Sequence, residues 1–163
     1  MESLVKFIKG FGYAARGIID TIISERNMRV HLVCVIYMFS ILGFTDWFVL
    51  SRTDWALLLV MTALVLAGEL VNTAIESVVD LVTGGEKKEL AKKAKDAAAG
   101  AVLVEAVLAV CVGLCVLLQK DAFIAMSDYF KTHIISLVIF GLSLIIAVLF
   151  MFKGVPFVKG KKK

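Results

Sequence analysis

Long uncharged runs of apolar residues constrain this chain more than any other feature. The runs WALLLVMTALVLAG (55–68) and THIISLVIFGLSLIIAVLFMF (132–152) contain no formally charged residue. The run at 132–152 and the mainly apolar blocks at 32–50, 55–82 and 96–118 are each long enough to supply the roughly 20 residues that a helix needs to cross a bilayer. Because 60% of the residues are hydrophobic and only one is proline, the sequence predicts an all-α integral membrane protein rather than a β-sheet fold.

The apolar blocks predict four membrane spans that follow an N-terminal surface helix. Residues 3–24 carry apolar side chains at helical spacing, interrupted by charged ones, which is typical of an amphipathic helix in the membrane interface. The spans are expected near 32–50, 55–82, 96–118 and 132–152. The charge-balanced segment QKDAFIAMSDYFK, which follows the third span, is expected to be a linker.

Lysine-rich segments beside the spans predict which way the chain crosses the membrane. The segments EKKELAKKAK (86–95) and KGKKK (159–163) carry half of the 18 lysine and arginine residues. Basic residues accumulate in cytoplasmic loops, so both termini and the loop after the second span are expected at the cytoplasmic face of the inner membrane. This position beside the spans favours a membrane edge, and no nucleic-acid partner is expected.

The second span carries a stripe of polar residues. Glu69, Asn72 and Glu76 are spaced so that they fall on one helix face, and Asp80 extends the stripe. Carboxylates inside a span are energetically costly and usually mark function. Hydrogen bonding between helices is the simpler reading, although a single Asn or Ser would be enough for it. The alternative is a site where a lipid headgroup meets a water-soluble ligand.

A nucleotide site on this stripe would not use a phosphate-binding loop. The motif G-x-x-x-x-G-K-[ST] is absent from the sequence, and Gly84-Gly85 is expected to end a helix. Carboxylate oxygens suit Mg²⁺, which proteins usually hold together with nucleotide phosphates. Arg26, Arg29 or Lys95 could instead balance the charge.

Three segments of the chain resemble a known family. GYAARGI with ERNMRVH, then ELVNTAIESVVD, then KAKDAAAGAVL are similar to the small bacterial membrane kinases of diacylglycerol and undecaprenol, over about residues 4–118. The resemblance implies three spans, transfer of a phosphoryl group from Mg-ATP to a lipid hydroxyl, and a homotrimer with active sites between protomers. It divides the chain into a lipid kinase domain, 1–118, and an additional segment, 119–163, with a linker, a fourth span and a basic tail.

The resemblance also implies roles for individual residues. Glu69 is similar to the general base that takes the proton of the lipid hydroxyl, and partial desolvation makes a carboxylate more effective in that task. Glu25 and Glu76 resemble the pair that binds Mg²⁺ with ATP, and Lys95 would neutralise charge on the transferred phosphoryl group. The implied ATP contacts are Tyr13, Glu25, Asn72, Glu76, Lys95 and Asp96, and the implied lipid contacts are Glu69, Lys6 and Ala99.

Two features bear on the lipid substrate and on departures from the family. ERNMRVH and AAGAVL are more similar to the Gram-positive undecaprenol kinases, since the alanines that follow Asp96 include no serine. Undecaprenol is therefore the expected substrate, and diacylglycerol is the alternative.

Glu105, inside the third span, and the fourth span itself depart from the family pattern. Glu105 either contacts substrate or makes an interhelical hydrogen bond in its protonated form.

Two other classes of protein are alternatives to the kinase. A small proton-coupled transporter would explain four spans with an intramembrane glutamate, but Glu69 and Glu76 lie toward the cytoplasmic half of the span rather than at the midplane. A structural subunit of a membrane complex would not need two carboxylates on one stripe. A lipid kinase is the function that the sequence favours.

Overall fold

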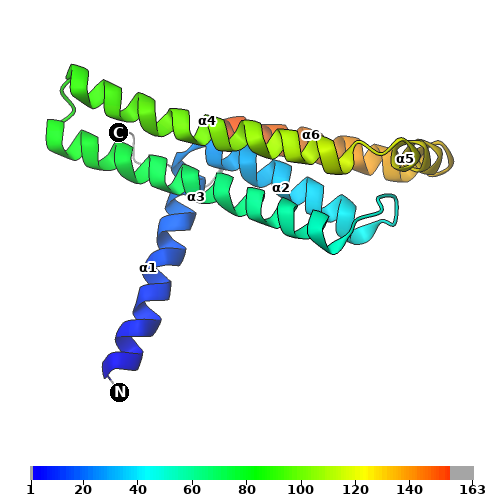
Figure 1. Ribbon diagram of the computed structural model, residues 1–163, viewed down its shortest axis with the longest axis horizontal. Helices are drawn as coiled ribbons and strands as arrows, with labels where there is room; N and C mark the ends of the chain where they lie inside the picture. The colour runs from blue at the N-terminus through cyan, green and yellow to red at the C-terminus, as the bar shows by residue number, and fades with distance from the viewer. Residues whose placement is uncertain (1, 155–163) are drawn as a thin grey trace.

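The protein is a bundle of helices from which the first helix projects (Figure 1). The computed structural model describes residues 2–154, so the basic tail at 159–163 lies outside the described residues. The helices are α1 (Glu2–Ser24), α2 (Arg26–Phe44), α3 (Arg52–Thr83), α4 (Glu89–Leu117), α5 (Lys120–Thr132) and α6 (Ile134–Lys153). Four of them, α2, α3, α4 and α6, are long and apolar enough to cross a membrane. The predicted all-α membrane fold is confirmed.

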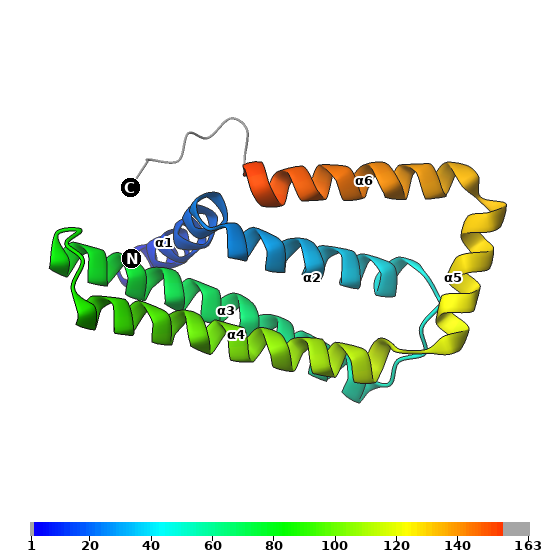
Figure 2. The same ribbon diagram turned by 90° about the horizontal axis from the view of Figure 1, so that it is seen from above.

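The segment expected as a linker between the third and fourth spans is instead a helix, α5. It crosses the end of the bundle and joins α4 to α6 (Figure 2). Its Tyr129 and Phe130 rings pack on Trp47, with ring centroids 5.4 and 6.0 Å apart. The segment does join the two spans, and its helical form, which was not predicted from the sequence, is stabilised by aromatic packing against the end of the bundle.

Two spans begin earlier in the sequence than expected. Only Glu25, with an extended backbone (φ −101°, ψ 122°), separates α1 from α2, which begins at Arg26. The third span was expected from about residue 96, but α4 begins at Glu89. Charged residues such as Lys, Arg and Glu are good helix formers. A change from polar to apolar residues therefore marks the membrane edge and does not mark the start of a helix.

Helices α3 and α4 form an antiparallel hairpin, side by side along most of their length (Figure 2). The start of α3 is fixed by a capping box. The Asp54 N–H donates to Ser51 Oγ, and the Ser51 N–H donates to the Asp54 carboxylate. At the other end, Gly84 and Gly85 adopt φ of 61° and 82°, which a residue without Cβ accepts at little cost. Their N–H groups donate to the Asp80 carbonyl, and the chain turns back into α4.

Helix α6 packs against α2, on the opposite side of α2 from α4 (Figure 2). The Tyr37 hydroxyl donates to Ser143 Oγ at 2.8 Å, and the Tyr37 ring lies edge-on to Phe140. At the far end of α6, the buried guanidinium of Arg29 donates to the Met151 carbonyl at 3.3 Å. Residues of α2 thus hold α6 near its middle and at its C-terminal end.

Arg29 binds backbone carbonyls, although the sequence had suggested it as a partner for the buried carboxylates. Its Nη1 donates to the carbonyls of Ile22 and Ile23, at 3.1 and 2.9 Å, in the last turn of α1. Carbonyls in the last turn of a helix lack intrahelical partners and attract cations. A single guanidinium therefore joins the C-terminal ends of α1 and α6 to the first turn of α2.

Gly68 on α3 leaves room for the side chain of Glu105 on α4. A Cβ added at Gly68 would overlap the Glu105 carboxyl group. The Oε2 atom of Glu105 is buried and has no hydrogen-bond partner among the described residues. Glu105, the departure from the family pattern, is therefore accommodated between α3 and α4 by the absence of a side chain at position 68.

The substitution Gly68→Ala is expected to destabilise the protein by about 1–3 kcal/mol, the usual cost of overpacking, because the new methyl group must displace Glu105. In a Glu105→Ala background the same substitution should cost less than about 0.5 kcal/mol. The measurement is thermal unfolding in detergent, followed by circular dichroism. Gly100→Ala on α4, where a Cβ meets no atom within 4 Å, is the control. An equal cost for Gly68→Ala in both backgrounds would contradict this packing.

Candidate active site

Glu69 lies in the middle of α3 and is the most completely buried large side chain among the described residues. It is 1% exposed, and its Oε2 atom has no hydrogen-bond partner within the described part of the chain. Its burial follows from its position, where α2 and α4 both flank α3. A buried carboxylate oxygen without a partner is unfavourable, and Glu105 has one as well; Glu69 differs because it lies on the polar stripe with Asn72 and Glu76.

Glu69 lines a groove of about 460 Å³ bounded by four helices, which we call the Glu69 groove. Its polar lining comes from α2 and α3 and its apolar lining mainly from α4, with one residue from α6. The lining residues are Arg26, Asn27, Val30, His31, Glu69, Asn72, Ala99, Val102, Leu103, Ala106 and Phe152. The structure therefore brings together Glu69 and Ala99, two of the residues that the sequence had suggested as lipid contacts.

The Glu69 groove adjoins a second, mostly apolar hollow of about 270 Å³ between α2, α3 and α4. His31 and Ala106 line both. The second hollow continues along α2 past Cys34 to Met38, and along α3 to Leu58, toward the end of the bundle that α5 covers. A polar site and an apolar channel thus follow one another along the helices, an arrangement that suits a lipid alcohol with its hydroxyl near Glu69.

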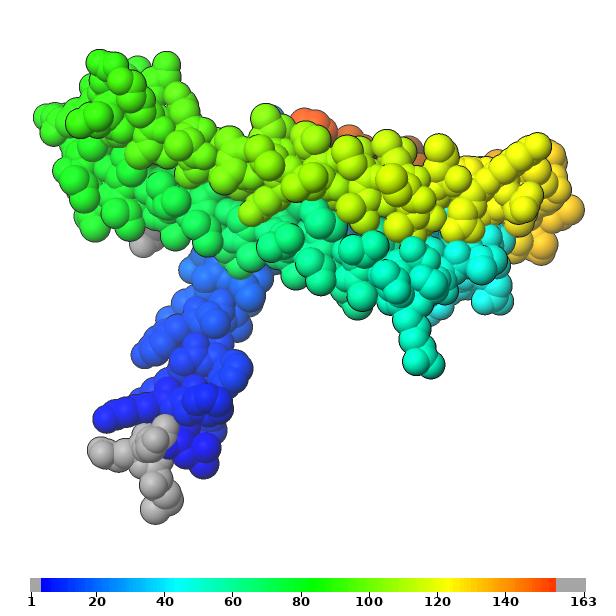
Figure 3. Space-filling model, viewed as in Figure 1, coloured from blue at the N-terminus to red at the C-terminus, as the bar shows by residue number. Residues whose placement is uncertain are grey.

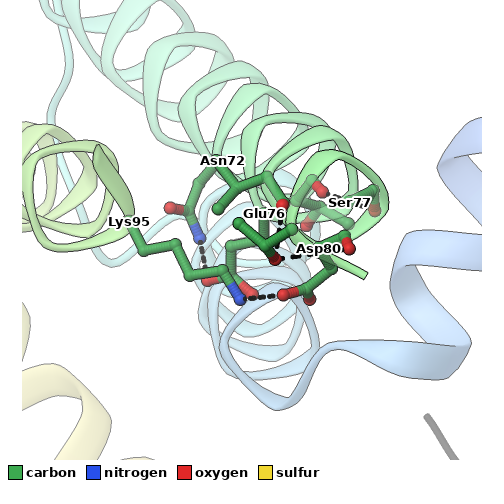
Figure 4. Close-up of polar contacts among 8 residues, drawn as sticks. Asn72, Glu76, Ser77, Asp80 and Lys95 are labelled. Carbon is green, nitrogen blue, oxygen red and sulfur yellow. Dashed lines mark hydrogen bonds and ion pairs between the residues drawn. The ribbon is translucent and has the colours of Figure 1, made fainter. Parts of the chain in front are cut away.

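The polar stripe of α3 is linked to α4 by direct contacts (Figure 4). Asn72 Nδ2 donates to Glu76 Oε1 at 3.2 Å, and Asn72 is itself buried. One helical turn further on, the Asp80 carboxylate pairs with Lys95 of α4 at 2.6 Å. Lys95 therefore lies beside the stripe, with Asp80 as its partner.

A second concave site, which we call the lysine pocket, lies at the turn between α3 and α4. Its volume is about 600 Å³, and its charged lining consists of Asp80, Glu86, Lys87, Lys88, Glu89, Lys92, Lys95 and Asp96. Four lysines and four carboxylates balance in this lining, and Lys88 and Lys95 are paired with Glu86 and Asp80, so a nucleotide would bind here by exchanging such pairs for phosphate contacts. At 1.5 Å per residue, Asp80 lies about 16 Å along α3 from Glu69. The polar stripe connects the lysine pocket to the Glu69 groove.

Two other carboxylates act on the charge of Glu69. The charges of Glu25, at the break between α1 and α2, and of Glu76 both act on the Glu69 carboxylate. A divalent cation would relieve this repulsion. Across the described residues, no three His, Cys, Asp or Glu side chains form a ready-made metal site. Mg²⁺ bound with nucleotide phosphates needs only one or two carboxylates, so Glu25 and Glu76 fit that kind of site.

Four of the suggested contacts line neither the Glu69 groove nor the lysine pocket: Glu25, Glu76, Lys6 and Tyr13. Lys6 and Tyr13 are exposed on α1, which stands away from the bundle (Figure 3). Conversely, Phe152 lines the groove, although no motif or spacing in the sequence assigns it a role. One phenylalanine among 11, in an apolar run, carries no signal that distinguishes it.

Comparison with known proteins identifies the family. The family model for prokaryotic diacylglycerol kinase matches residues 12–117. The chain belongs to this family. It is 42% identical to the undecaprenol kinase of Bacillus subtilis (strain 168), over 73% of this chain and 94% of that enzyme. It is 46% identical to the diacylglycerol kinase of Synechocystis sp., over 66% of this chain and 60% of that enzyme. No solved structure matches it significantly.

Family membership confirms the function expected from the motifs. The diacylglycerol kinase of Escherichia coli (strain K12) is a further relative, 35% identical over 69% of this chain and 88% of that enzyme. The protein is a lipid kinase, a membrane enzyme that acts on a nucleotide and a lipid. The match ends at residue 117, so α5 and α6 lie beyond the family's common region.

Proposed function

We propose that this lipid kinase phosphorylates the hydroxyl of undecaprenol with Mg-ATP at the cytoplasmic face of the inner membrane, and that Glu69 is the general base. The main observation behind the proposal is the buried Glu69 carboxylate, with an unpartnered Oε2, in a groove that adjoins a mostly apolar hollow. This geometry suits an alcohol whose chain lies among apolar side chains and whose hydroxyl reaches an acceptor.

Glu69 would act by holding and then accepting the proton of the lipid hydroxyl. The hydroxyl donates to the carboxylate oxygen, and the proton moves to Glu69 as the alcohol oxygen bonds to the γ-phosphorus of ATP. The bond from that phosphorus to the β-phosphate oxygen breaks, and ADP leaves. Phosphoryl transfer depends mainly on positioning and electrostatics. A water-poor groove strengthens both, because it removes competing hydrogen bonds and lowers the local dielectric.

Glu25 and Glu76 are the residues that we assign to Mg²⁺, which would neutralise charge on the phosphates. The Asn72 amide fixes the orientation of Glu76 through its hydrogen bond. Lys95 and Asp96, in the lysine pocket, are assigned to the nucleotide. Lys95 would have to exchange its bond to Asp80 for a phosphate oxygen. Both side chains keep part of their surface open, at 32% and 41% exposed, so a phosphate oxygen can reach Lys95 and compete with Asp80.

The assembly that we propose is a homotrimer with sites shared between chains. Lys6 and Tyr13 lie too far along the projecting α1 to line either concave site of their own chain. They would reach a nucleotide or a lipid only in a neighbouring protomer. The large apolar side chains of α1, including Phe7 and Phe11, are also exposed, which suits contact with a membrane surface or a second chain.

Undecaprenol is proposed over diacylglycerol because of the motif similarity and because the Bacillus subtilis relative is an undecaprenol kinase. Phosphorylation of undecaprenol and dioleoylglycerol in the same detergent should give a higher kcat/KM for undecaprenol. The measurement is transfer of radiolabelled phosphate, resolved by thin-layer chromatography. A clear preference for dioleoylglycerol would reverse the assignment. If neither lipid is phosphorylated, the substrate assignment fails altogether.

The substitution Glu69→Gln is expected to lower kcat by about 10²–10⁴-fold, the usual contribution of a general base, because an amide cannot accept the proton. Binding of Mg-ATP, measured by isothermal titration calorimetry, should change little. Asp128→Asn on α5, at the other end of the bundle, is the matched carboxylate-to-amide control and should retain full activity. Near-normal turnover by Glu69→Gln would remove Glu69 from the base role.

The substitution Glu76→Gln is expected to raise the Mg²⁺ concentration needed for half-maximal activity by about tenfold or more, because a neutral amide is a weaker ligand. Excess Mg²⁺ should restore much of the rate, which it cannot do for Glu69→Gln. The measurement is ADP release as a function of Mg²⁺ at fixed ATP. An unchanged Mg²⁺ dependence in both Glu76→Gln and Glu25→Gln would exclude this pair as the metal site.

A further inference from the structure

Helix α6 contributes one side of the Glu69 groove, although it lies outside the region shared with the family. The groove is lined by α2, α3 and α4, and by Phe152 from the last turn of α6. The family match ends at residue 117, so this lining residue is a feature of the additional segment. The groove of a protein ending there would be open on that side.

The last turn of α6 is held in place by specific contacts rather than by apolar packing alone. Arg29 donates to the Met151 carbonyl, one residue before Phe152. The guanidinium also lies against Gly154, where an added Cβ would be 3.5 Å from Arg29 Cζ. More than two helical turns before Phe152, the hydrogen bond between Tyr37 and Ser143 fixes the register of α6 on α2. The position of Phe152 is therefore determined by α2, the same helix that supplies much of the groove.

Phe152 offers an apolar surface that a ligand can cover. Phe152 is 65% exposed, yet it lines the Glu69 groove, whose polar end holds Glu69 and Asn72. The apolar wall opposite consists of Val102, Leu103 and Ala106 on α4. A single hydrocarbon chain attached to a hydroxyl at Glu69 would pass between this wall and the phenyl ring. A diacylglycerol branches into two esters beside its hydroxymethyl group and is wider at that point.

We propose that Phe152 is a specificity-determining residue, which contacts the chain of the lipid alcohol next to its hydroxyl and favours single-chain prenols over two-chain glycerides. This inference rests on the proposed function, because it takes the Glu69 groove to be the lipid site. Phe152 touches no reacting atom. Its contribution is therefore to substrate binding and selection and not to the chemical step.

The test is steady-state kinetics of the full-length Phe152→Ala variant with undecaprenol and dioleoylglycerol in one detergent. The apparent KM for undecaprenol should rise by about tenfold, the scale of a lost apolar pocket contact, with kcat unchanged. The kcat/KM ratio of undecaprenol to dioleoylglycerol should fall by a similar factor. Phe152→Leu, which keeps an apolar side chain, should recover most of the wild-type KM.

The control is Ile146→Ala on the same helix, a residue that is 67% exposed and lines neither the Glu69 groove nor the adjoining channel. It should leave both lipids unaffected. If Phe152→Ala and Ile146→Ala give the same KM and the same lipid ratio, the inference is overturned. Circular dichroism of each variant establishes that the helices are intact.

A readout that does not need turnover separates this inference from the proposed function. A photoreactive phenylalanine analogue in place of Phe152 should crosslink to radiolabelled undecaprenol, whereas the same analogue in place of Ile146 should not. Selective crosslinking in a protein that phosphorylates neither lipid would overturn the proposed substrate and uphold the lipid contact. Equal crosslinking at both positions would overturn the lipid contact, whatever the activity.

Discussion

The burial of one carboxylate in a membrane helix is the constraint on which the rest of this structure depends. Glu69 is 1% exposed, with an unpaired oxygen, and several kcal/mol are typically lost when such a group is removed from water without a partner. A hydrogen-bond donor bound in the groove that Glu69 lines would offset this cost. The neighbouring carboxylates Glu25 and Glu76 add repulsion, which a bound cation would relieve. The fold is thus arranged around groups that its ligands would satisfy.

The α3–α4 hairpin connects the two places where a lipid and a nucleotide would bind. The glycine turn at Gly84 and Gly85 brings Lys95 back beside Asp80, and this creates the lysine pocket at the end of the same helix that holds Glu69. Asn72 and Glu76 lie between the two sites and are hydrogen-bonded to each other. A lipid kinase must bring together substrates from two phases. A polar stripe on one face of a membrane helix provides a direct route between them.

The features that could be predicted from the sequence are those with a periodic or compositional signal. Uninterrupted apolar runs predicted α3 and α6, and the spacing of Glu69, Asn72 and Glu76 predicted the stripe. Helix α5 was missed because its stability comes from ring packing on Trp47, a contact between segments distant in sequence. The role of Arg29 was missed for the same reason, since its carbonyl partners belong to the ends of two other helices.

The contacts of Arg29 also bear on why α6 is present. Two of its three hydrogen bonds go to the last turn of α1, so the junction between α1 and α2 keeps its main support without α6. The third bond, to Met151, adds little to that junction but fixes the turn that carries Phe152. The α3–α4 hairpin likewise makes its closest contacts within itself and with α2. Within the described part of the chain, helix α6 contacts α2 and α5 and makes no close contact with the hairpin, so what it adds to the site is Phe152 in the lining of the Glu69 groove.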